Sequence, residues 1–138
     1  MPIVCPTEGA TQLLDKMLSK ALSVDENYTL KLYQNNYVPT TASTATSFTE
    51  CTFVGYSALT LTRAGWNASV VSGTVAEATY GTTCTFTLSS GASQTVYGAF
   101  VLGATSGKVL MAEAFATPRV LGVGDSLTYT PSVTFTNA

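Results

Sequence analysis

The chain has 138 residues, a formal net charge of −2, 10% charged residues and no histidine. This length predicts a single domain, and so weak a charge disfavours binding to nucleic acid. The absence of histidine removes the commonest general base and metal ligand, which favours assembly over catalysis. Ordinary domains carry about 25% charged residues. A chain poor in charge and rich in threonine and serine is therefore expected to have a surface largely covered by other proteins.

The N-terminal residues predict an extended arm over residues 1–6 and one amphipathic helix over residues 7–22. In the helix, apolar residues recur at spacings that place them on one face. Thr7 is suited to cap the first turn. We expect the apolar face to pack against the domain's own sheet, and docking onto a neighbouring subunit is the alternative. The residues of this face are Leu13, Leu14, Met17, Leu18, Ala21 and Leu22.

Targeting signals and cysteines bear on the compartment in which the chain folds. The first residues lack the basic and long apolar regions of a secretory peptide. The longest apolar stretch, Val96 to Ala104, is much shorter than the ~18 residues of a membrane-spanning helix, so no membrane is expected as a partner. The odd number of cysteines, Cys5, Cys51 and Cys84, predicts free thiols in a reducing compartment. A disulfide between two of them is the alternative.

The first predicted strand, Tyr28–Gln34, is followed by a long loop of small residues over Val38–Ser47. Loops of this length in compact domains are generally functional or disordered. We expect this loop to become ordered only against a partner.

Beyond Phe48 the sequence alternates polar and apolar residues with glycine between the segments, which predicts a β-rich body over residues 28–138. With the first strand there are about eight antiparallel strands, the range of a β-sandwich or jelly-roll-like fold. Gln94–Leu102 and Lys108–Ala116 have apolar residues at both parities and are expected to be central, and Pro131 predicts an edge or a bulge. The remaining predicted strands are Ser57–Arg63, Ala68–Val71, Thr74–Tyr80, Thr83–Leu88, Gln94–Leu102, Lys108–Ala116 and residues 127–136.

The carboxylates are scattered, so the candidates for a catalytic or metal site are weak. Glu77 and Glu113 would have to meet across a cleft to act as the carboxylate pair of a glycosidase. The run Asp25-Glu26-Asn27 offers oxygen ligands for calcium but lacks the spacing of a calcium-binding loop. We therefore expect no enzyme activity, no catalytic residues, no metal or cofactor, and no small-molecule ligand.

Two further residues have a structural and a functional interpretation. Glu113 lies in an apolar stretch, where a buried carboxylate needs a partner, and Arg119 or Arg63 is the natural one. We expect a structural ion pair rather than a reactive group. Trp66 is expected to close one end of the core, and the alternative is that it anchors an interface, where tryptophan is enriched.

After a short leader and a helix, six segments that together span most of the chain carry a resemblance to known proteins. They are Leu30–Asn36, Phe48–Tyr56, Leu61–Trp66, Tyr97–Val101, Glu113–Arg119 and Gly124–Asp125. In this order they resemble a family of small virion structural proteins of tailed bacteriophages. The segments are packing and turn positions and contain no chemical motif. The resemblance therefore implies a non-enzymatic virion component, with no catalytic residue to carry over, and leaves open whether it belongs to the head or the tail.

From composition and resemblance together we expect a capsid decoration, or cement, protein, assembled in the host cytoplasm, that binds the outer surface of the head and clamps its subunits. Its partners would be the major capsid protein and itself, as a homotrimer, because closed symmetry suits local three-fold positions. A tail, neck or fibre-base structural protein is one alternative, and a carbohydrate-binding or hydrolytic β-sandwich is another. The arm is expected to extend a neighbour's sheet edge. The candidate interaction residues are Pro2, Ile3, Val4, Cys5, Pro6, Thr40, Thr41, Ser43 and Thr44.

Overall fold

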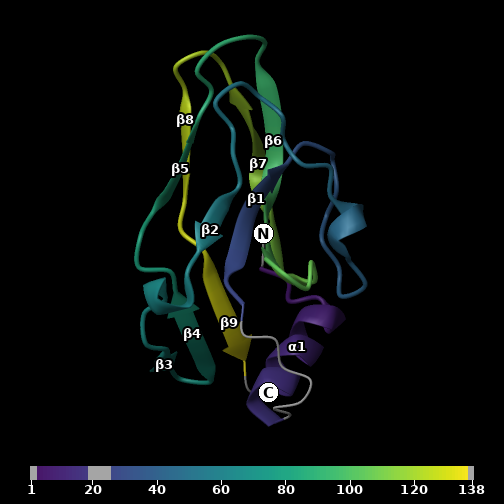
Figure 1. The fold of residues 1–138 in the computed structure, drawn as a ribbon, viewed down its shortest axis with the longest axis vertical. Helices are drawn as coiled ribbons and strands as arrows, with labels where there is room; N and C mark the ends of the chain where they lie inside the picture. The colour runs from purple at the N-terminus through teal and green to yellow at the C-terminus, as the bar shows by residue number, and fades with distance from the viewer. Residues whose placement is uncertain (1–2, 19–25, 137–138) are drawn as a thin grey trace.

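The structure, a computed structural model, describes residues 3–18 and 26–136, with residues 15–18 described by their backbone (Figure 1). It is mainly β, with nine strands in antiparallel sheets and one N-terminal helix, which confirms the predicted fold class. Residues 19–22 of the predicted helix lie outside the described residues. The elements are α1 (Thr7–Leu18), β1 (Tyr28–Tyr33), β2 (Leu59–Leu61), β3 (Val70–Ser72), β4 (Val75–Thr79), β5 (Cys84–Thr87), β6 (Gln94–Gly103), β7 (Val109–Leu121), β8 (Ser126–Tyr129) and β9 (Ser132–Thr136).

The strands form two layers. One layer is a four-stranded sheet in the order β2-β1-β6-β7, and the other consists of a β3-β4-β9 sheet and a β5-β8 pair. Because β5 follows β4 and β9 follows β8, the two parts of the second layer form one long ribbon, which Figure 1 shows running beside the four-stranded sheet. In the described part of the chain, no helix is long and apolar enough to span a membrane.

The C-terminal strand predicted over residues 127–136 is interrupted at Pro131, which is why nine strands are found. Cys84 pairs with Tyr129 and Thr79 pairs with Ser132, so residues 80–83 lie opposite a shorter stretch. Proline has no N–H to donate to a ladder, and Pro131 contributes only its carbonyl, which accepts a hydrogen bond from the Tyr80 amide at 2.8 Å. In place of the predicted edge or bulge, this proline lies at a break between two separately paired strands, β8 and β9.

The main hydrophobic core lies between the two layers and contains residues from β1, β5, β6, β7 and β8. A second, smaller cluster lies on the other face of the four-stranded sheet, where Phe48 stacks on Phe100 with ring centroids 4.6 Å apart. Residues on both faces of β6 and of the first half of β7 are therefore buried, as apolar residues at both parities predict. In sheet order, β6 is central but β7 is an outer strand, so the prediction that both are central is wrong for β7.

The turn between β6 and β7 is held by a buried carboxylate. Glu26 is 5% exposed, and its side chain accepts hydrogen bonds from the Thr105 amide at 2.6 Å, the Ser106 amide at 2.9 Å and the Ser106 hydroxyl at 2.8 Å. A Cβ atom at Gly103 would collide with this carboxylate and with the Ser106 hydroxyl. Glu26, considered above as a calcium ligand, therefore caps a turn, and Asp25 lies outside the described residues.

Helix α1 packs against the same hairpin, which confirms that it docks on the domain's own sheet. Its Glu8 accepts a hydrogen bond from the Val109 amide at 2.6 Å, and Gln12 donates one to the Ser106 hydroxyl at 2.7 Å. Leu13 packs against the main core, whereas Leu14 is exposed. The helix is thus fastened by polar contacts at its first turns as well as by one apolar side chain.

Replacing the buried carboxylate should destabilise the hairpin. We expect Glu26→Ala to lower the free energy of unfolding by about 1–3 kcal/mol, because the Thr105 and Ser106 amides lose their acceptor. Urea unfolding followed by circular dichroism measures this. Glu77→Ala, at an exposed carboxylate on β4, is the matched control and should change stability by less than about 0.5 kcal/mol. Equal effects of the two substitutions would contradict the assigned role of Glu26.

Candidate interaction surface

The two segments predicted to bind partners lie next to each other in the structure. The amide of Thr7, the first residue of α1 and the one that follows the arm, donates a hydrogen bond to the carbonyl of Thr41 in the long loop at 2.9 Å. The sequence separates these segments by more than thirty residues, and only the fold brings them together. They form one candidate interaction surface, made of the arm (residues 3–6) and the threonine loop (residues 38–47).

The arm extends the chain's own sheet. Val4 and Ala112 of β7 exchange two backbone hydrogen bonds of 2.8 Å each, Pro6 is fully buried, and Ile3 packs against the main core. The expectation that the arm adds to a neighbour's sheet edge is therefore wrong for Val4, and Pro6 is buried; Ile3 and Cys5 stay candidates for contact, and Pro2 lies outside the described residues. The edge of β7 offers unpaired backbone groups close by, and a segment of the same chain satisfies them without the entropic cost of association.

The threonine loop has a defined conformation set by contacts within the chain. Ser43 is 1% exposed, and its hydroxyl accepts a hydrogen bond from the Thr40 amide at 2.8 Å and lies 2.8 Å from the Tyr37 hydroxyl. The expectation that the loop becomes ordered only against a partner is thus corrected. Thr40, Thr41 and Thr44 are exposed and remain candidates for contact, whereas Ser43 is a structural residue of the loop.

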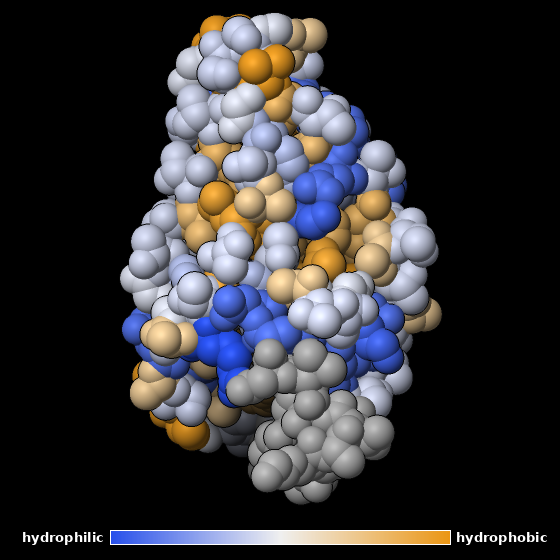
Figure 2. All heavy atoms as spheres, in the orientation of Figure 1, coloured by the Kyte–Doolittle hydropathy of each residue, from blue (hydrophilic) through white to orange (hydrophobic). Residues whose placement is uncertain are grey.

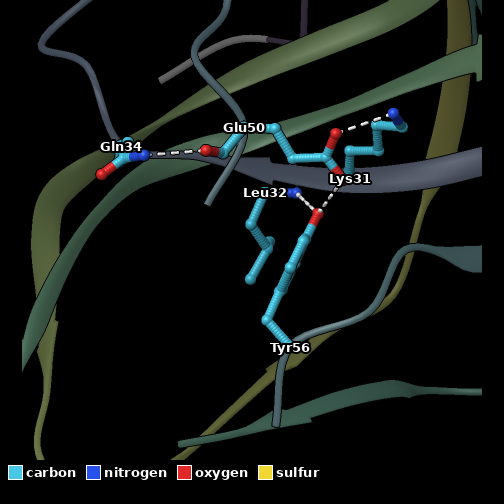
Figure 3. Close-up of polar contacts among 5 residues, drawn as sticks. All are labelled: Lys31, Leu32, Gln34, Glu50 and Tyr56. Atoms are coloured by element: carbon cyan, nitrogen blue, oxygen red, sulfur yellow. Dashed lines mark hydrogen bonds and ion pairs between the residues drawn. The ribbon is translucent and has the colours of Figure 1, made fainter. Parts of the chain in front are cut away.

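The ends of this loop are clamped by a polar network on β1 (Figure 3). The side-chain amide of Gln34 donates to the Glu50 carbonyl at 2.8 Å, and the Glu50 carboxylate pairs with Lys31 at 2.8 Å. The Tyr56 hydroxyl donates to the same carboxylate at 3.0 Å and accepts a hydrogen bond from the Leu32 amide at 3.1 Å. Burial, together with the negative charge of Glu50, raises the pKa of Tyr56. The residues on either side of the loop are therefore held in fixed positions.

The surface of the molecule is weakly polar. Figure 2 shows a face covered mostly by residues of intermediate hydropathy, with the strongly hydrophilic ones in separate patches. Several large apolar side chains are also exposed. Single exposed apolar residues are normal, but a cluster of them indicates an interaction surface. These residues are Leu14, Val38, Val54, Val70, Val71, Val120, Val123 and Phe135.

The two carboxylates considered as a catalytic pair line different hollows. Glu77 lines a hollow of about 380 Å³ beside Trp66, and Glu113 lines another of about 320 Å³ beside Arg119. Neither of these hollows contains both carboxylates, so they do not face each other across either one. The arrangement therefore lacks the geometry of a glycosidase site at these two residues.

The predicted ion pair of Glu113 with an arginine is wrong. Its carboxylate instead accepts a hydrogen bond from the Tyr129 hydroxyl on β8 at 2.8 Å, and burial together with this negative charge raises the pKa of Tyr129. Trp66 packs edge-on against Tyr80 with ring centroids 5.5 Å apart and contacts the core, as its structural interpretation predicts.

Comparisons with known proteins add no family assignment. No protein-family model matches the chain, and a search of the curated proteins finds no match. The interpretation of the surface therefore depends on its geometry. Sequence reasoning did not single out Val70, Val71 and Phe135, although all three are exposed. In the sequence, the one sign of exposed apolar side chains was the pair of adjacent valines, Val70 and Val71, in a short predicted strand. Phe135 gave no such sign, because it alternates in phase with Leu127 and Pro131, which are buried.

The clamp at the base of the threonine loop can be tested at Tyr56. We expect Tyr56→Phe to lower the free energy of unfolding by about 1–3 kcal/mol, because the Leu32 amide and the Glu50 carboxylate each lose a partner. Chemical denaturation measures the loss. Tyr97→Phe is the matched control, since the Tyr97 hydroxyl has no hydrogen bond to any described residue. A smaller effect at Tyr56 than at Tyr97 would refute the clamp.

The cysteines should differ in reactivity. All three are unpaired, Cys5 is half-buried, and Cys51 and Cys84 are buried. Burial, with the charge of Glu50, raises the pKa of Cys51 to about 12, and burial raises the pKa of Cys5 and Cys84. Near neutral pH little reactive thiolate exists at Cys51. We expect a chromogenic disulfide reagent to label Cys5 first in the native protein and all three only after unfolding, with Cys5→Ser removing the first phase.

Proposed function

We propose that this chain is a non-enzymatic structural protein of a bacteriophage particle that decorates the outside of the head as a cement protein. The observation that carries the proposal is the threonine loop, which is exposed, uncharged and held in place before any partner binds. A preformed loop loses little conformational entropy on association. Threonine side chains also lose less hydration than charged ones when an interface covers them.

A decoration protein needs many modest contacts rather than one strong one. Specific interfaces bury on the order of 1,600 Å², and repetition of the contact over a symmetric shell multiplies its effect through avidity. The proposed partners are the major capsid protein and further copies of this chain, and the expected oligomeric state is a homotrimer. The low charge of the chain and its exposed apolar side chains support a surface that is covered in the particle.

Copy number and position in purified particles test the function directly. Quantitative gel densitometry with cryo-electron microscopy should find hundreds of copies on the outer surface of the head. A few dozen copies at a vertex or on the tail would instead establish the alternative, a tail, neck or fibre-base protein. Absence from the particle would overturn both assignments.

The threonine loop itself can be tested by adding a charge. We expect Thr41→Lys to weaken binding to undecorated heads by at least about tenfold, because covering an unpaired ammonium costs more than the ~1.4 kcal/mol that a tenfold change represents. Co-sedimentation with heads measures the change. Thr85→Lys, at an exposed threonine on β5, is the matched control and should bind as the wild type does. Loss of binding only in the control would move the contact to the other layer.

A further inference from the structure

The small sheet of β3, β4 and β9 carries an apolar row on one face. Val71 pairs with Ala76, and Ala76 pairs with Phe135, so the three side chains lie side by side across the sheet. Val71 is 71% exposed and Phe135 is 50% exposed. Large apolar side chains that are exposed next to each other mark an interaction surface.

The same face borders a hollow that the described residues do not fill. The hollow has a volume of about 380 Å³ and is lined by Leu13 of α1, Trp66, Val133 and Phe135 among others. The indole Nε1 of Trp66 is buried and has no hydrogen-bond acceptor among the described residues. A buried donor without an acceptor costs free energy. A further molecule bound on this face could fill the hollow and accept a hydrogen bond from the Trp66 indole.

The edge of this sheet is unprotected. In the described part of the chain, β3 pairs with β4 on one side and with no strand on the other (Figure 1). Natural edge strands avoid association by carrying lysine, proline or inward-pointing charges. Residues 64–76, which contain β3, include no charged residue and no proline. The backbone groups at this edge are thus available to pair with another strand.

We propose that the β3 edge and the row Val71–Ala76–Phe135 form the contact between copies of this chain. A second copy fits because both the edge and the row are uncharged, so identical surfaces meet without repulsion between like charges. Identical patches that meet are related by a two-fold axis, so this contact predicts a dimer in place of the homotrimer expected from capsid symmetry. This inference deepens the proposed function by naming the surface through which the protein self-associates.

The test is the molar mass of the purified full-length chain, measured by light scattering and native mass spectrometry. We expect the wild type to have a mass of two or more 14.4 kDa chains. Val71→Lys and Phe135→Lys, at opposite ends of the row, should each reduce the mass to that of one chain. Val123→Lys is the matched control, since Val123 is 62% exposed in the turn between β7 and β8, far from β3 (Figure 1), and should leave the oligomer intact. Circular dichroism verifies that each variant is folded.

Other results would overturn the inference. The inference is overturned if the wild type stays a single chain at all concentrations. It is also overturned if an oligomer persists in both row variants, or if it dissociates only in Val123→Lys. A single chain that carries a bound small molecule would assign the hollow to a ligand instead. The proposed function is tested on particles, so it and the self-association surface can fail separately. A monomer that coats heads refutes only the self-association surface. An oligomer that is missing from particles refutes only the decoration role.

Discussion

The hairpin of β6 and β7 has buried hydrophobic side chains on both of its faces, so the chain must supply a cover for each. The β4-β5 and β8-β9 ribbon covers one face and closes the main core. The other face is covered by the residues that follow β1, where Phe48 stacks on Phe100. The threonine loop is therefore part of a structural cover, and this is why it has a defined conformation in the isolated chain.

Four of the eight acidic residues accept hydrogen bonds that hold the fold together, and of these Glu26 is buried and the other three are half-buried. Glu8 and Glu26 accept hydrogen bonds from the backbone of the β6–β7 hairpin, Glu50 pairs with Lys31 and Tyr56, and Glu113 accepts a hydrogen bond from Tyr129. Each of these acids satisfies donors that burial would otherwise leave without a partner.

The two candidate surfaces lie on different sides of the molecule (Figure 1). The arm and the threonine loop lie against the β7 edge, and the apolar row lies on the small sheet at β3. The proposed attachment to a shell and the proposed association with further copies would each use one of these surfaces. Their different chemistry, hydroxyl-rich at one and apolar at the other, suits contacts with different partners.

The sequence by itself determined which segments are strands and that both faces of β6 and of the first half of β7 are buried, because side-chain periodicity is a local property. It also marked Pro131 as an irregular position, because a missing N–H acts wherever the strand lies, but it predicted one strand where the structure has β8 and β9. Only the tertiary structure decided that Val4 pairs with Ala112 of the same chain and that Tyr129, rather than an arginine, meets Glu113. These pairings depend on strand order and register, which join residues far apart in the sequence and leave no periodic signal.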